Sequence, residues 1–240
     1  DMNPEALGDN DLSSLKDHSF KVIDATRDLA VAYKPNFAFF ERWGAVGFAW
    51  LEEIVSYIGK EHITIADAKR GDIGNTADQY AKSIFDHFGF DSVTLNPYMG
   101  SDSISPFLGR KEKGAFILCR TSNRSAKELQ DKMVDDEPYY LHVARFISGL
   151  NKNDNAGMVV GATAPEELQR IRDIAPDSPL LIPGVGAQGG DLSHSLRVGN
   201  QSGIGLINVS RGISFVGDMS EKSIHSAAAN YVEQMRDILR

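Results

Sequence analysis

The sequence predicts an α/β protein with the (β/α)8 (TIM) barrel fold, and three observations carry this prediction. Short apolar runs alternate with longer amphipathic stretches along the 240 residues. The short runs are continuously apolar, which is typical of strands covered on both faces of a parallel sheet. Strict strand–helix alternation requires helical crossovers between parallel strands. Because such a barrel has about 250 residues, we expect residues 1–240 to form a single domain.

Seven runs are predicted to be strands because they are short, apolar and bounded by Gly, Pro, Asn or charged residues. They are Leu29–Lys34, His62–Ala68, Ser92–Asn96, Gly114–Arg120, Ala156–Gly161, Leu180–Pro183 and Gly205–Val209. This is one strand fewer than the barrel needs, so we expect its first strand to precede Asp1 and to be missing from this sequence. An open doubly wound sheet is the alternative fold.

The stretches between these runs have helical patterns. In Thr76–Phe88, for example, Tyr80, Ile84 and Phe88 are four residues apart and share one face. Thr163 and Glu166 are spaced like a capping box that would open a helix ending at Ile174. The other predicted helices are Ser14–Asp28, Ala45–Ile58, Tyr139–Leu150 and Ser223–Leu239.

Composition excludes several classes of protein. Hydrophobic residues make up 42% of the chain and charged residues 24%, which is enough to bury a sizeable core. The net charge of −8 argues against a nucleic-acid binder. We see neither an apolar run long enough to span a membrane nor a signal peptide. Cys119 is the one cysteine, which excludes an internal disulfide, and we expect it to pack in the core of a cytoplasmic protein.

Polar residues and glycines gather after the predicted strands, where the active site of a barrel is built. Lys34-Pro35-Asn36 follows the first run, and Asp67–Ile73 ends the second. Further along are Asn96–Gly100, Arg120–Asn123, Pro183–Asp191 and Ser210–Gly212. The six histidines lie outside these segments and lack ligand spacing, so we expect no metal site. The sequence also lacks a Rossmann dinucleotide fingerprint, and we expect no cofactor.

Asp67, Lys69 and Asp72 are the most informative of these residues. Asp67 and Lys69 are two apart, so on a strand their side chains point to the same side. Two carboxylates beside a lysine favour its ammonium form, which makes Lys69 a candidate proton donor. A purely structural ion-pair network is the alternative interpretation of this pattern.

The segment after the Leu180–Pro183 run indicates an anion site. Glycines at 184, 186, 189 and 190 could leave backbone N–H groups free to face an anion. Arg211, just past the last run, adds a guanidinium suited to phosphate. Many barrels hold phosphate at these two strand ends, so the pattern favours a phosphorylated substrate over a merely tight turn.

These segments together resemble the orotidine 5′-phosphate decarboxylase family. Asp67-Ala68-Lys69-Arg70-Gly71-Asp72-Ile73-Gly74-Asn75-Thr76 is similar to its signature, and Pro183–Asp191 to its phosphate-binding loop. Ala32–Glu41 and Cys119–Asn123 are similar to its bacterial and protozoan branch. The resemblance extends from Asp1 to the last predicted helix.

The resemblance implies a function and a set of residue roles. The chain is expected to convert orotidine 5′-phosphate to UMP and CO₂ in pyrimidine biosynthesis without a metal, and to form a homodimer. The implied catalytic residues are Lys34, Asp67, Lys69 and Asp72, with Lys69 protonating C6 and Asp67 near the departing carboxylate. The implied substrate-binding residues are Asp1 for the ribose, Ser122 for the pyrimidine, Gln188 and Arg211 for the phosphate, and also Thr76, Pro183, Gly189 and Ser210.

In the family, the residues matching Asp72 and Thr76 reach across the dimer interface into the partner's site. Ser210 is a departure, because some members have glycine there. Its backbone N–H would still be present, so we expect the change to be tolerated.

Two other functions remain open at this point. A related decarboxylase or aldolase that acts on a sugar phosphate shares the Asp-x-Lys-x-x-Asp pattern but uses Mg²⁺, and it would not need Ser122 as a pyrimidine contact. A catalytically inactive nucleotide-binding protein could use the same pocket. The four alternating charges argue against this second function, because a binding module has no need of them.

Overall fold

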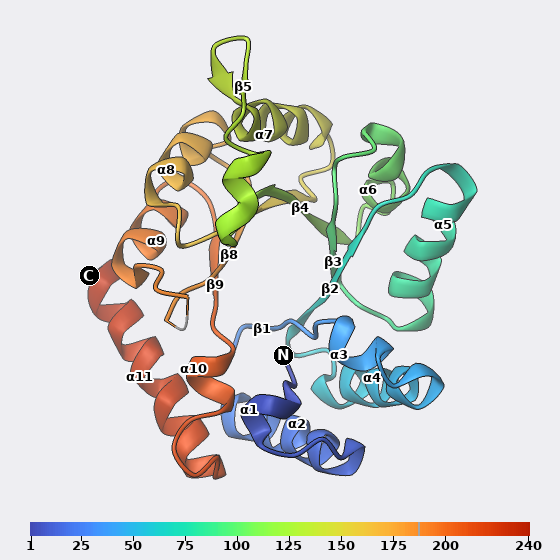
Figure 1. Ribbon diagram of the computed structural model, residues 1–240, viewed down its shortest axis with the longest axis vertical. Helices are drawn as coiled ribbons and strands as arrows, with labels where there is room; N and C mark the ends of the chain where they lie inside the picture. The colour runs from blue at the N-terminus through green and yellow to red at the C-terminus, as the bar shows by residue number, and fades with distance from the viewer. Residues whose placement is uncertain (187) are drawn as a thin grey trace.

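The computed structural model describes residues 1–186 and 188–240, and a curled sheet of seven parallel strands forms its centre (Figure 1). In order across the sheet, the strands are β1 (Ala32–Tyr33), β2 (Ile63–Arg70), β3 (Ser92–Leu95), β4 (Gly114–Arg120), β7 (Ala156–Val160), β8 (Leu180–Pro183) and β9 (Gly205–Asn208). Each overlaps one of the seven predicted runs. The parallel α/β barrel architecture is confirmed, and the open doubly wound alternative is wrong.

Helices surround this sheet on its outer side (Figure 1). The longer ones are α2 (Leu12–Thr26), α4 (Gly44–Ile58), α5 (Gly74–Lys82), α7 (Tyr139–Leu150), α8 (Pro165–Ile174), α9 (Leu192–Gly199) and α11 (Glu221–Leu239). Short elements are α1 (Pro4–Leu7), α3 (Ala38–Glu41), the π-helix η1 (Ser83–His87), the 3-10 helices η2 (Ser101–Ser103) and η3 (Arg124–Glu128), α6 (Ser105–Leu108) and α10 (Arg211–Ser214). A hairpin of β5 (Met133–Val134) and β6 (Glu137–Pro138) projects beside η3 and α7.

Side chains at several N-termini explain where the helices begin. Asp11 accepts a hydrogen bond from the Ser14 N–H at the start of α2, and Ser220 accepts one from Ser223 at the start of α11. The predicted capping box is wrong, because α8 has Ala164 at its N-cap and no side-chain cap. The Thr163 hydroxyl instead donates to the Ser122 carbonyl at 3.2 Å. Thr163 therefore stabilises the segment that follows β4 rather than the start of its own helix.

The strands separate two sets of apolar side chains. Ile65, Phe116, Val159 and Leu181 come from four different strands and form a small cluster inside the barrel. The alternate residues along the strands pack outwards against the helices in a much larger cluster that includes Trp50. Burial on both faces is the reason why the strands are apolar without interruption.

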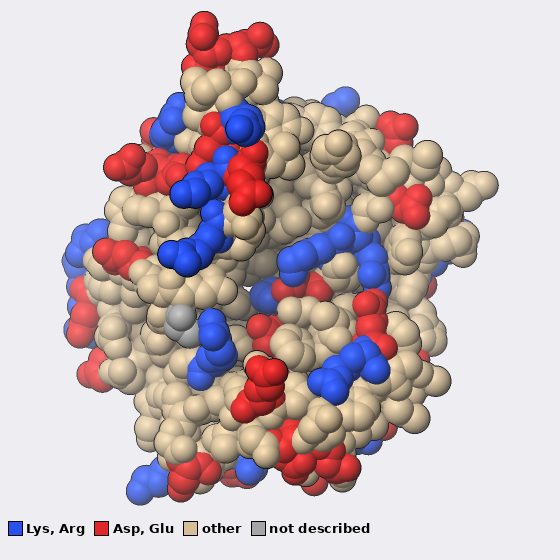
Figure 2. All heavy atoms as spheres, viewed as in Figure 1, with Lys and Arg blue, Asp and Glu red and all other residues tan. Residues whose placement is uncertain are grey.

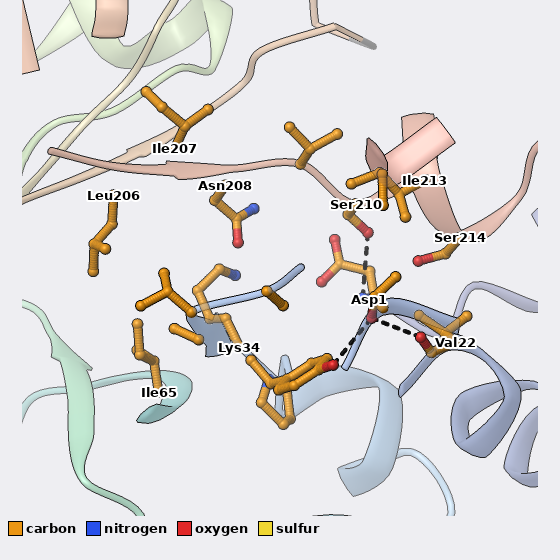
Figure 3. Close-up of a pocket in the computed structure, with 18 of the residues that line it drawn as sticks. Asp1, Val22, Lys34, Ile65, Leu206, Ile207, Asn208, Ser210, Ile213 and Ser214 are labelled. Atoms are coloured by element: carbon orange, nitrogen blue, oxygen red, sulfur yellow. Dashed lines mark hydrogen bonds between the residues drawn. The ribbon is translucent and has the colours of Figure 1, made fainter. Parts of the chain in front are cut away.

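The two edge strands, β1 and β9, face each other across a largely apolar cavity of about 350 Å³ (Figure 3). Ile65, Leu206 and Ile207 are among its lining residues. Within the described residues, the eighth strand expected for a complete barrel does not occupy this position. Asp1 and Lys34 also line this cavity, and so connect it to the polar end of the barrel.

In the part of the chain that the structure describes, no helix combines the length and the apolarity needed to cross a bilayer.

Arg172 forms a hydrogen-bond network at the end of the barrel opposite the predicted site. It lies in α8 and is 1% exposed. Its guanidinium donates to the carbonyls of Ser178 before β8 at 2.7 Å, Gly199 at the end of α9 at 2.5 Å and Pro176 at 2.9 Å. A single buried side chain thus satisfies backbone acceptors in the segment between α8 and β8 and at the end of α9, where an unsatisfied carbonyl would be costly.

We predict that Arg172→Met lowers the free energy of unfolding by about 3 kcal/mol, because it leaves several buried carbonyls without a donor. Urea unfolding monitored by circular dichroism measures the change. Arg236→Met, at an exposed position of α11, is the matched control and should change stability little. Equal stability of the two variants would contradict the structural role of Arg172.

Candidate active site

Lys34, Asp67 and Lys69 form a linear ion-pair cluster at the carboxyl ends of β1 and β2. Lys34 Nζ lies 2.6 Å from Asp67 Oδ2, and Lys69 Nζ lies 2.6 Å from Asp67 Oδ1. The side chains of Lys34 and Asp67 are 11% and 9% exposed, whereas that of Lys69 is 50% exposed. The cluster is therefore anchored in the protein at Lys34 and open to the cavity at Lys69.

The backbone holds Asp67 in place from the β1 side. Its N–H donates to the Pro35 carbonyl at 3.0 Å, and its carbonyl accepts from the Phe37 N–H at 3.1 Å. On the β3 side the pairing changes register, because Ala66 is opposite Val93 but Arg70 is opposite Leu95. The intervening residues of β2 form a bulge, a feature that often re-aims side chains near active sites.

Within this bulge, Lys69 has a φ of 47°, which is unusual for a residue other than glycine. Its side chain still reaches Asp67, so the prediction that both point to the same side is confirmed. The geometry is not that of a regular strand, however. The backbone N–H of Lys69 donates to the Thr94 hydroxyl at 2.9 Å rather than to a strand carbonyl.

The two ammonium groups control the protonation of Asp67. Burial alone would raise the pKa of this carboxyl, but the charges and hydrogen bonds of Lys34 and Lys69 outweigh burial and lower it to about 2. Asp67 is therefore ionised at neutral pH, and it holds two cations at the edge of the cavity.

This cluster forms one wall of a cavity of about 480 Å³, a volume suited to a small-molecule ligand. Lysine, arginine, aspartate and glutamate side chains border the hollow at the centre of this face (Figure 2). Nine of the predicted site residues line the cavity: Asp1, Lys34, Asp67, Lys69, Ser122, Pro183, Gln188, Ser210 and Arg211. Eight of them are at the carboxyl ends of five strands, β1, β2, β4, β8 and β9, and Asp1 is at the start of the chain. The tertiary structure brings them together.

Asp1 and Ser210 meet between the two edge strands. The α-amino group of Asp1 donates to the Ser210 hydroxyl at 3.3 Å (Figure 3). Ser210 is the N-cap of the short helix α10, and Arg211 is its first residue. The guanidinium is exposed and lines the same cavity as Gln188. These two side chains supply the donors for an anionic group in this part of the cavity.

The glycine-rich loop departs from the sequence-based expectation. The N–H groups of Gly189 and Gly190 donate to the carbonyls of Gly186 and Gly184, at 2.8 and 3.0 Å. These two amides are thus used inside the loop and are not free to face an anion. A Cβ at Gly190 would lie 2.5 Å from Ala162, so this glycine is needed for close packing. Ala187 lies outside the described residues.

Ser122 lies on the segment that follows β4, and neighbouring side chains fix that segment. Gln130 binds Thr121 twice: its Oε1 accepts from the Thr121 N–H at 2.9 Å, and its Nε2 donates to the Thr121 hydroxyl at 2.8 Å. Arg120 is nearly buried and forms an ion pair with Asp131 at 3.0 Å. These contacts hold the backbone of the segment at the rim of the cavity.

Asp72 and Thr76 do not line the cavity, and neither does Gly189. Asp72 accepts a hydrogen bond from the N–H of Ile73 at 2.8 Å, and Thr76 is exposed in the first turn of α5. A single copy of the chain thus brings together three of the four predicted catalytic residues.

Sequence reasoning missed three polar residues that line the cavity, Thr94, Gln130 and Asn208. Thr94 is inside an apolar strand and reads as an ordinary β-branched residue. Gln130 is in a segment without periodicity. The available signal for Thr94 was a polar side chain in the middle of a buried strand, because such groups need partners.

We predict that Asp67 contributes about 2 kcal/mol to stability, because folding lowers its pKa. A lowered pKa stabilises the fold at pH values above the pKa of the carboxyl in the unfolded chain. This contribution disappears as pH falls from about 4 towards 2. The difference in unfolding free energy between the wild type and Asp67→Asn should therefore shrink between about pH 5 and pH 3. Urea titrations measure it, with exposed Asp237→Asn as the control. A difference that is constant over this range would contradict the prediction.

Comparisons with known proteins agree with this geometry. Residues 11–223 match the family described as "Orotidine 5'-phosphate decarboxylase / HUMPS family". A curated orotidine 5′-phosphate decarboxylase from Halorubrum lacusprofundi is 48% identical over 227 residues, which cover 91% of this chain and 80% of that protein.

Two solved structures from Leishmania donovani are similar over 94% of the chain. The OMP decarboxylase is 39% identical with a TM-score of 0.84, and 88% of its chain is covered. The UMP synthase is 43% identical with a TM-score of 0.89, and this chain spans 50% of its length. The family match covers most of the sequence, and the relatives are well above 30% identity over most of its length. The chain therefore belongs to the orotidine 5′-phosphate decarboxylase / HUMPS family.

Proposed function

We propose that this protein is an enzyme that decarboxylates orotidine 5′-phosphate to UMP and CO₂ in pyrimidine biosynthesis, without a metal or another cofactor. The observation that carries the proposal is the Lys34–Asp67–Lys69 cluster, which shares a cavity with Gln188 and Arg211. A nucleoside monophosphate whose ring bears a carboxylate needs a cation beside the ring. It also needs hydrogen-bond donors for its phosphate at the other end of the cavity.

The reaction breaks the bond between C6 and the carboxylate and leaves the electron pair on C6. The pyrimidine ring offers no π-system to delocalise this pair, so a fixed positive charge next to C6 must stabilise it. Lys69 is suited to this role, because its ammonium is held by Asp67 yet half exposed to the cavity. The same ammonium then transfers a proton to C6, which gives UMP.

The remaining cavity residues bind and orient the substrate in this proposal. Gln188 and Arg211 bind the phosphate, Ser122 the pyrimidine and Asp1 the ribose. Pro183 contributes from the end of β8, and Ser210 and Gly189 contribute from the segments after β9 and β8, Gly189 through its backbone after a local rearrangement. Binding energy at the remote phosphate can offset the cost of closing the site and excluding water around the reacting carbon.

Turnover of orotidine 5′-phosphate, followed by the loss of its ultraviolet absorbance in the presence of EDTA, tests the reaction. We expect turnover to survive EDTA and kcat/KM to fall by about a thousandfold or more in Lys69→Ala, because the transition-state charge loses its partner. Lys82→Ala, whose ammonium pairs with Asp78 on the surface of α5, is the control.

Each rival function gives a different result in this assay. Activity that EDTA abolishes, or turnover of sugar phosphates with Mg²⁺, would favour the related sugar-phosphate enzyme. Binding of UMP without turnover by the wild type would favour an inactive nucleotide-binding protein. Either result would contradict the proposed function.

The proposal includes a homodimer in which Asp72 and Thr76 complete the partner's site. Two observations support it. Neither residue lines the cavity of its own chain. Large apolar side chains are also exposed in the loops that follow β2 and β3, namely Ile73 at 51%, Tyr98 at 76% and Met99 at 47%. A partner subunit that covers these side chains would remove their apolar surface from water.

Mixing two inactive variants tests the shared site. In a mixed dimer of Lys69→Ala and Asp72→Asn subunits, one site has both residues intact. Random exchange should therefore restore roughly a quarter of wild-type activity. Light scattering should show a dimer, and mixing Lys69→Ala with itself should restore nothing. A monomer, or no recovery after exchange, would contradict the shared site.

We further propose that residues 1–240 act as one domain in the cytoplasm. A continuous hydrophobic cluster that extends from Leu15 to Val198 supports the single domain. The buried thiol of Cys119 packs in this cluster, which is consistent with a reducing compartment.

A further inference from the structure

Thr94 connects the charged cluster to the neighbouring strand. It lies on β3 and is 1% exposed. Its hydroxyl donates to Asp67 Oδ1 at 3.0 Å and accepts from the backbone N–H of Lys69 at 2.9 Å. A hydroxyl has one proton and two lone pairs. Thr94 is therefore hydrogen-bonded both to the Asp67 carboxylate and to the backbone of Lys69, the proposed proton donor.

Both bonds occur where the β2–β3 ladder is interrupted. The register shift leaves the Lys69 N–H without the strand carbonyl that a regular parallel pair would offer. Lys69 also has a φ of 47° there, a conformation that costs free energy and persists only when its surroundings enforce it. The Thr94 hydroxyl replaces the missing carbonyl and supports this conformation.

The hydrogen bond from the Thr94 hydroxyl to Asp67 determines the orientation of the carboxylate plane. Oδ2 receives Lys34 and Oδ1 receives both Lys69 and Thr94. Among these three donors, Thr94 is the neutral one, and its backbone is fixed inside a buried strand. Lysine side chains have several rotatable bonds, so they cannot define the carboxylate plane as firmly as this short side chain.

We infer that Thr94 is a positioning residue for the decarboxylation: through its hydroxyl it fixes the Asp67 carboxylate and the Lys69 backbone, and so aims the Lys69 ammonium at the reacting carbon. This inference rests on the proposed function. Thr94 supports the geometry of the reacting groups rather than the affinity for the substrate, whose phosphate is bound at the Gln188 side of the cavity. Its removal should therefore act on kcat more than on KM.

Thr94→Val removes the hydroxyl and keeps the branched shape. We expect kcat to fall by about tenfold or more, as for a lost hydrogen bond to a charged group, while KM changes by less than about threefold. Thr94→Ser restores the hydroxyl and should recover most of kcat. If Thr94→Val does not fold, Thr94→Ala replaces it under the same criteria.

Thr64→Val is the matched control. Thr64 is 2% exposed on β2, and its hydroxyl also donates to a carboxylate, that of Asp91, and accepts from a backbone N–H. This pair is at the amino end of β2, away from the cavity. Thr64→Val measures the effect of losing the same two bonds in a buried strand. Equal effects of the two substitutions on kcat would overturn the inference.

A readout without turnover separates this inference from the proposed function. The pKa of Asp67, measured by carbon NMR of its carboxyl, should rise in Thr94→Val, because the ionised form loses a donor while Lys34 and Lys69 still face it. Thr64→Val should leave it unchanged. If the wild type does not decarboxylate orotidine 5′-phosphate, the proposed function fails and this titration still decides the role of Thr94. An unchanged pKa of Asp67 would overturn that role.

Discussion

The structure around the cavity depends on one interaction, the Asp67 carboxylate held between the ammonium groups of Lys34 and Lys69. A buried carboxylate is costly unless it is paired and hydrogen-bonded. The fold meets this requirement with two cations, a threonine hydroxyl and a backbone fixed to the segment after β1. Three neighbouring parallel strands must end at the same level for these groups to meet.

The proposed reaction centre and the proposed phosphate site are at different places on the barrel rim. The lysine cluster is at the ends of β1 and β2, whereas Gln188 and Arg211 follow β8 and β9. A cavity of about 480 Å³ joins the two regions. This separation suits a substrate with its reacting ring at one end and its phosphate at the other. Rigid strands set the distance between the regions, and the loops supply the functional groups.

Much of the fold could be predicted because strand burial leaves a strong local signal. Each of the seven predicted strand runs overlaps a strand, and α7 has the predicted bounds Tyr139–Leu150. Local patterns failed where a side chain had a distant partner. Thr163 was predicted to cap its own helix, but its hydroxyl donates a hydrogen bond to the Ser122 carbonyl beyond the neighbouring strand β4. The amides of Gly189 and Gly190 were expected to face an anion but close their own loop.

The sequence by itself determined the fold class, the family and the identity of most residues at the cavity, because alternating elements and short motifs are properties of the local chain. The tertiary structure decided which of these residues meet. It joined Lys34 to Asp67 across β1 and β2, left Asp72 outside the cavity, and gave Thr94 two partners in the β2 bulge. Such contacts depend on strand register and on a bulge, and neither is encoded in any single segment.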